Sequence, residues 1–77
     1  MVTNAAFAQR VGCNYTMASK IRNGTRRPSG GLLTRIILAY ELDAEQAIEA
    51  YAGGPVVFGD YLTEHVFKAP DAMADAG

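Results

Sequence analysis

The chain has 77 residues, enough for one small domain, and its single cysteine excludes a fold held together by an intramolecular disulfide. The formal net charge of −1 hides an asymmetry: six of the seven Lys and Arg residues lie in the basic half (residues 1–40), and all eight Asp and Glu residues lie in the acidic half (residues 41–77). A basic segment without carboxylates is typical of a surface that meets a polyanion, although a solvated cationic face has the same composition.

No segment resembles a signal peptide or a membrane span. The longest apolar run, Leu32 to Tyr40, is short and is interrupted by Arg35. Together with the single cysteine, this predicts a soluble protein of the reducing cytoplasm.

Helix caps, glycines and prolines divide the chain into five expected helices. These helices cover residues 5–11, 15–23, 31–41, 44–52 and 56–67. Thr3 or Asn4 can cap the first helix, and Asn14 can cap the second. Asp43 and Gln46 form a capping-box pattern before the fourth. Because no apolar run alternates cleanly with polar residues, the expected fold class is all-α.

Glycines and a proline mark the connections. Gly12 closes the first helix, Gly24 closes the second, and the following loop contains Pro28. Residues 69–77 are small and acidic, so we expect a disordered tail after a single domain of residues 1–68.

The first two helices form the pattern of a helix-turn-helix. Their apolar faces share the spacing i, i+1, i+4 and consist of Phe7, Ala8 and Val11, then Met17, Ala18 and Ile21. Gly12 lies in the short turn between them, where a positive φ is expected. In a helix-turn-helix the second helix enters the major groove of DNA.

These residues also carry a family resemblance. The matching segments are Phe7 to Gly12, Ala18 to Gly24, Arg26 to Ser29, Leu32 to Leu33 and Ile36 to Leu42. Over about half of the chain they resemble the LAxxxG, SxxxxG, RxPS and LxxIAxxL blocks of the Cro/C1 (Xre-type) helix-turn-helix repressor family. The resemblance implies a small five-helix lambda-repressor-like domain of the phage Cro or small immunity repressor kind. It lacks the family's usual N-terminal helix, since only three residues precede Asn4.

The same resemblance implies a transcriptional repressor that binds double-stranded operator DNA in the cytoplasm of a bacterial host cell. The outward polar side chains of the second helix can exchange hydrogen bonds with base edges. Carried onto this chain, the resemblance gives the expected base contacts as Asn14, Tyr15, Thr16, Ser19 and Lys20. Helix capping is the competing role of Asn14 and Thr16, and solvation alone is that of Ser19.

Arginines cluster at the end of the second helix and in the loop after it, and a guanidinium matches the geometry of a phosphate. The expected phosphate contacts are Asn4, Arg10, Arg22, Asn23, Arg26 and Arg27. Asn4 is included because the first amides of a helix attract anions. Arg10 and Arg35 can reach the flanking backbone or pair instead with an acidic residue of the acidic half.

The helix 31–41 is apolar almost all round and needs cover on several sides. The last helix, 56–67, offers a stripe composed of Phe58, Tyr61, Leu62, Val66 and Phe67. Two arrangements remain open: the stripe folds back in place of the missing N-terminal helix, or it packs on a second copy in a homodimer. The surplus apolar surface also suggests an alternative function, a protein-interaction module of the antirepressor or antitoxin kind, in which the helices are only a scaffold.

No arrangement for catalysis, a cofactor or a metal is predicted. His65, the only histidine, is expected in the core or an interface, and Cys13 is expected to be a small buried side chain. One Cys and one His are too few for a zinc site, and no nucleophile–base pair indicates an enzyme. We therefore expect no enzymatic activity and no small-molecule substrate.

Overall fold

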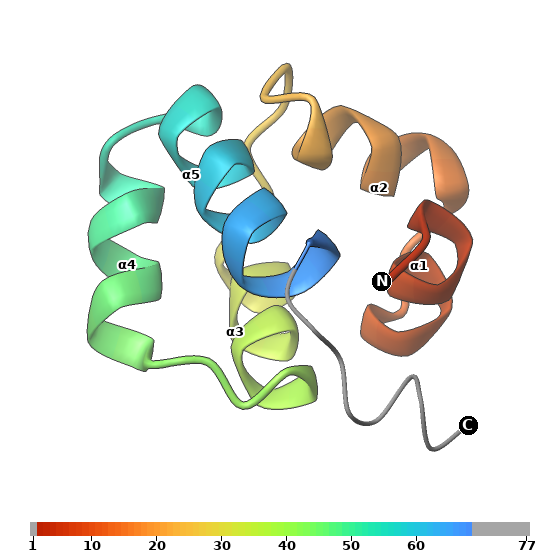
Figure 1. Cartoon of the computed structure of the whole chain (residues 1–77), viewed down its shortest axis with the longest axis horizontal. Coiled ribbons are helices and arrows are strands. Elements are labelled where there is room, and N and C mark those ends of the chain that lie inside the picture. The colour runs from red at the N-terminus through yellow and green to blue at the C-terminus, as the bar shows by residue number, and fades with distance from the viewer. Residues whose placement is uncertain (1, 69–77) are drawn as a thin grey trace.

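The computed structural model describes residues 2–68, which form helices and no strand. The helices are α1 (Asn4–Val11), α2 (Tyr15–Arg22), α3 (Gly30–Ala39), α4 (Ala44–Ala52), α5 (Pro55–Leu62) and η1 (Thr63–Phe67), a π-helical turn that continues α5. The expected all-α class is confirmed (Figure 1). The expected acidic tail, residues 69–77, lies outside the described residues.

Side-chain caps start the helices at the predicted places. The cap oxygens accept hydrogen bonds from first-turn amides: Thr3 from Ala6 at 3.0 Å, Asn14 from Met17 at 2.7 Å and Asp43 from Gln46 at 3.0 Å. Thr3, rather than Asn4, is therefore the cap of α1. Ser29, for which the sequence predicted no capping role, caps α3 by accepting from the Leu32 amide at 3.2 Å.

Three helices end in a left-handed residue. The φ angles of Gly12 and Gly24 are both 78°, and glycine adopts this conformation without strain. The third such residue is Glu41, with a φ of 51°. Its turn lets the Leu42 amide donate to the Ile37 carbonyl at 3.0 Å, so α3 ends before the expected Glu41.

The last helix folds back into its own chain. Phe58, Leu62, Val66 and Phe67 are buried and Tyr61 is half-buried, so the predicted stripe packs on the core of its own chain. In Figure 1, α5 crosses the middle of the molecule between α4 and α2. The expected single helix 56–67 is divided into α5 and the π-helical turn η1. The backbone amide of Lys68 closes this turn by donating to the Thr63 carbonyl at 2.8 Å.

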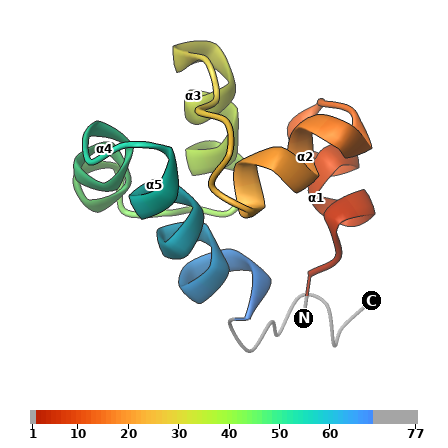
Figure 2. The same cartoon turned by 90° about the horizontal axis from the view of Figure 1, so that it is seen from above.

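The end of this helix joins the two halves of the sequence. The Phe7 ring lies 5.0 Å from the Phe67 ring and 5.8 Å from the Tyr40 ring, measured between centroids. The Val2 amide donates to the Phe67 carbonyl at 3.4 Å. Figure 2 shows the resulting arrangement, with the start of the chain beside the end of η1. The last helix thus covers α1 and the core.

Some side chains are less buried than the sequence suggested. His65 is exposed rather than in the core, because it lies on the outer side of η1 with its ring 4.4 Å from that of Tyr61. Cys13 is half-buried. Leu38 is 73% exposed, so α3 is covered on fewer sides than expected.

Candidate nucleic-acid interface

The predicted base contacts form a polar ridge on α2. Ala18 and Ile21 are fully buried on the inner side of this helix. Of the ridge residues, Asn14, Tyr15, Thr16 and Lys20 are exposed and Ser19 is half-buried. Asn14 also caps the helix, which is the competing role considered for it. An α-helix such as α2 is about 10–12 Å across with its side chains, which is close to the width of the major groove.

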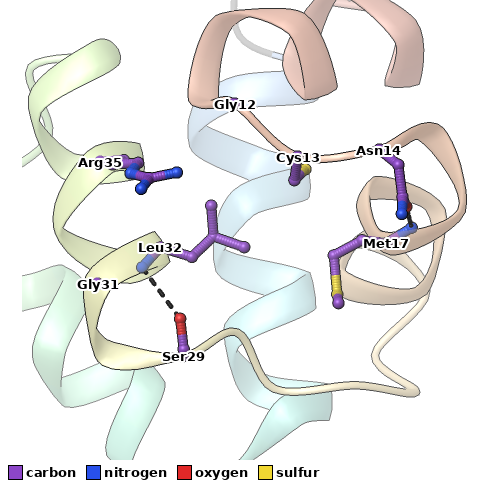
Figure 3. A pocket seen from close by; sticks show the side chains of 8 residues that line it. All are labelled: Gly12, Cys13, Asn14, Met17, Ser29, Gly31, Leu32 and Arg35. Atoms are coloured by element: carbon purple, nitrogen blue, oxygen red, sulfur yellow. Dashed lines mark hydrogen bonds between the residues drawn. The ribbon is translucent and has the colours of Figure 1, made fainter.

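One groove separates α2 from the start of α3; we call it the α2–α3 groove. It has a volume of about 450 Å³. Its lining residues are Gly12, Cys13, Asn14, Met17, Ser29, Gly31, Leu32 and Arg35. In Figure 3, Leu32 and Arg35 extend from α3 toward the turn between α1 and α2. Arg35 Nη1 lies 3.3 Å from the position that a Cβ at Gly12 would occupy, so the glycine leaves room for this guanidinium.

A second groove separates α2 from the start of α1; we call it the α1–α2 groove. It has a volume of about 300 Å³. Its lining residues are Val2, Thr3, Asn4, Ala5, Tyr15 and Arg22. Arg22 Nη1 donates to Asn4 Oδ1 at 3.0 Å. Two of the predicted phosphate contacts are therefore joined to each other, and both are half-buried.

The starts of three helices line these two grooves. α1 and α2 begin at the α1–α2 groove, and α2 and α3 begin at the α2–α3 groove. The caps of these three helices are neutral, and their first turns hold no acidic residue, whereas α4 has Asp43 as its cap and Glu45 in its first turn. First-turn amides lack intrahelical acceptors and carry partial positive charge, so this side of the molecule attracts anions.

Three arginines lie over aromatic rings. The distances from guanidinium carbon to ring centroid are 4.9 Å for Arg10 over Tyr40, 4.6 Å for Arg22 over Phe67 and 4.9 Å for Arg27 over Tyr51. Within residues 2–68 the one ion pair joins Lys68 to Glu64 at 3.9 Å, between exposed side chains. The acidic partner considered for Arg35 is thus not found in this part of the chain. A ring attracts a guanidinium without neutralising its charge.

Tyr51 also holds the loop that carries the remaining arginines. Its hydroxyl donates to the Pro28 carbonyl at 2.6 Å. Arg26 and Arg27 are exposed on this loop, as is Asn23 at the end of α2. Tyr51 and Phe67 were not identified as site residues from the sequence, because no fixed spacing relates a ring to an arginine on another helix.

The remaining chemistry of the site is limited. Burial raises the pKa of the Cys13 thiol, so the site does not favour a thiolate. In the part of the chain that the structure describes, no three His, Cys, Asp or Glu side chains gather as metal ligands. Nor does any helix there have the length and apolar character to cross a membrane.

Comparisons of the chain with protein-family models, curated proteins and solved structures find no match. What the site binds is therefore inferred from its shape, its amides and its charge.

Proposed function

We propose that the protein is a sequence-specific DNA-binding repressor in which α1 and α2 act as a helix-turn-helix. The observation that carries the proposal is the polar ridge of α2 between two grooves, each lined by residues from the starts of two helices. A helix in the major groove has a phosphate backbone on either side. The α1–α2 groove and the α2–α3 groove supply anion-attracting surfaces on both flanks of the ridge.

The side chains suit distinct roles at such an interface. Lys20 can donate to the O6 and N7 atoms of guanine, and the Thr16 methyl group can pack on a thymine methyl. Tyr15 and Ser19 offer hydroxyls to neighbouring base edges. Repression then follows when the bound protein occludes a promoter.

A mobility-shift experiment tests this function. Genomic or phage DNA fragments are incubated with the protein at two salt concentrations, with random competitor DNA present. We expect a discrete band that survives competitor and weakens with salt, with a log–log slope of roughly −0.9 per neutralised phosphate. If no band forms, or if competitor removes all shifted DNA, the proposal is wrong.

Variants connect the binding to the ridge and the loop. Arg26→Ala removes an exposed charge from the loop, so the salt slope should fall by roughly 1 and affinity should drop for specific and random DNA alike. Lys68→Ala is the matched control, because it removes an equal charge that is already paired with Glu64. Lys20→Ala should cost roughly 1–3 kcal/mol and relax the sequence preference at one position.

A second candidate is the protein-interaction module. It is favoured by four exposed apolar side chains that line neither groove: Leu38 (73%), Ile48 (53%), Val56 (63%) and Val57 (47%). Such a module would form a stoichiometric complex with a protein partner and would show no salt-sensitive DNA binding. The mobility shift therefore separates the two candidates.

A further inference from the structure

We propose that Tyr51 and Phe67, two aromatic residues of the acidic half, are positioning residues for phosphate contacts made by Arg27 and Arg22. The inference rests on the proposed DNA-binding function. Neither ring touches DNA; each acts through the arginine that lies over it. The acidic half then contributes to DNA binding through these two rings, although its charges repel DNA.

The Tyr51 ring is fixed before any ligand arrives. It packs edge-on against the Phe58 ring at 5.6 Å, with an angle of 89° between the ring planes, and Phe58 is 1% exposed. Its hydroxyl donates to the Pro28 carbonyl at 2.6 Å. The guanidinium of Arg27 lies over this rigid ring while its side chain remains exposed. Restricting a long side chain in advance reduces the entropy lost when it binds.

Phe67 holds Arg22 in a similar way at the α1–α2 groove. Phe67 is fully buried, its ring lies 5.0 Å from that of Phe7, and its carbonyl accepts from the Val2 amide at 3.4 Å. Arg22 lies over the ring and uses Nη1 to donate to Asn4. A guanidinium has five N–H donors, so this hydrogen bond leaves others for a phosphate in the α1–α2 groove.

Aromatic rings are better suited than carboxylates to orient an arginine that must bind a phosphate. A carboxylate would occupy the guanidinium donors and cancel the charge, whereas an aromatic face binds the plane of the guanidinium and leaves its N–H edge outward. Within residues 2–68, neither Arg22 nor Arg27 forms an ion pair. Both arginines are thus oriented and still cationic, as a polyanionic partner requires.

A double-mutant cycle on DNA affinity tests the proposal. The variants are Arg27→Ala, which removes the guanidinium, Tyr51→Leu, which removes the ring, and the two combined. Each single change should weaken binding about three- to tenfold. Tyr51→Phe keeps the ring and removes only the hydroxyl bond to the Pro28 carbonyl. When the effect of Tyr51→Phe is subtracted, the double variant should bind about as well as Arg27→Ala alone, because the ring itself acts through Arg27. With the same subtraction, Tyr51→Leu and Arg26→Ala should be additive.

Phe67 and Arg22 are tested in the same way, with Phe67→Leu and Arg22→Ala. The matched control is Tyr61→Leu, which removes a half-buried ring that stacks on Phe58 at 6.3 Å with no described arginine over it. DNA affinity should be unchanged in this control. Circular dichroism of every variant establishes that it is folded.

The outcomes separate the two proposals. Coupling between each ring and its own arginine, without coupling to Arg26, supports the positioning role. If the losses are additive in folded variants while the unmodified protein binds DNA, the positioning role alone is wrong. If the unmodified protein does not bind DNA, both the proposed function and this inference are wrong. If the ring variants unfold, Arg27→Lys and Arg26→Lys decide. Both changes keep the charge and lose the planar fork, and the loss of affinity at Arg27, which lies over a ring, must exceed the loss at Arg26.

Discussion

The close contact between α5 and the end of α2 leads to a quantitative prediction for Gly59→Ala. Gly59 is buried where α5 passes over the last residues of α2. A Cβ at this position would lie 3.0 Å from the Ile21 carbonyl oxygen, 3.0 Å from that of Arg22 and 3.1 Å from the Gly24 nitrogen. All three are backbone atoms, so the contact is relieved only if α5 moves away from α2.

The magnitude follows from two opposing terms. Overpacking of this kind costs about 1–3 kcal/mol, and alanine recovers up to about 1 kcal/mol through its higher helix propensity. We expect a net loss of about 1–2 kcal/mol in the free energy of unfolding. In a domain of this size each kcal/mol lowers the melting temperature by roughly 4–8 °C, so the expected fall is about 4–16 °C. Displacement of α5 should also weaken DNA binding, because η1 holds Arg22.

Thermal and urea unfolding, followed by circular dichroism, measure this effect. Gly30→Ala is the matched control, because a Cβ there would meet nothing within 4 Å, and it should be at least as stable as the unmodified protein. A Gly59→Ala protein that melts at or above the temperature of the unmodified chain would refute the reasoning about the α2–α5 contact.

Three further predictions concern stability. Glu41→Gly should raise the free energy of unfolding by about 1 kcal/mol and raise the urea midpoint, because Glu41 holds a φ of 51°; an unchanged midpoint would contradict this. Asn14→Ala should lower the free energy of unfolding by about 1 kcal/mol, because the α2 cap is lost. Asn14→Asp should keep the cap and its stability, but its negative charge should weaken DNA binding in the mobility shift. Burial raises the pKa of Cys13 and, together with the charge of Asp43, that of Tyr61. The protonated forms are favoured in the fold, so stability is complete below the ordinary thiol pKa of 9.0 and should fall as the pH rises above it; an alkaline urea midpoint equal to the neutral one would exclude this linkage.

Much of the secondary structure is predictable from short-range features. The caps Thr3, Asn14 and Asp43 act on amides three residues away, and Gly12 and Gly24 close helices by their own conformational freedom. The outward polar ridge of α2 is predictable as well, because helical periodicity alone determines which side chains lie opposite the apolar face. Glu41 escaped prediction because its side chain gives no sign of a left-handed backbone.

Other features depend on how the helices cross. The two arrangements left open for the last helix differ only in which surface covers it, and the structure places its apolar stripe inside the chain. Periodicity identifies an apolar face but does not name its partner.

The candidate site likewise combines features that are visible in the sequence with features that only the tertiary structure shows. The charge asymmetry and the clustered arginines are visible in the sequence, yet their supports are not: Tyr51 reaches a carbonyl 23 residues away, and Arg22 reaches Asn4 over 18 residues. Local composition thus determined which basic and polar groups are exposed. Tertiary packing alone decided which rings and side chains hold them, because contacts between helices are set by how the helices cross in three dimensions and not by spacing along the chain.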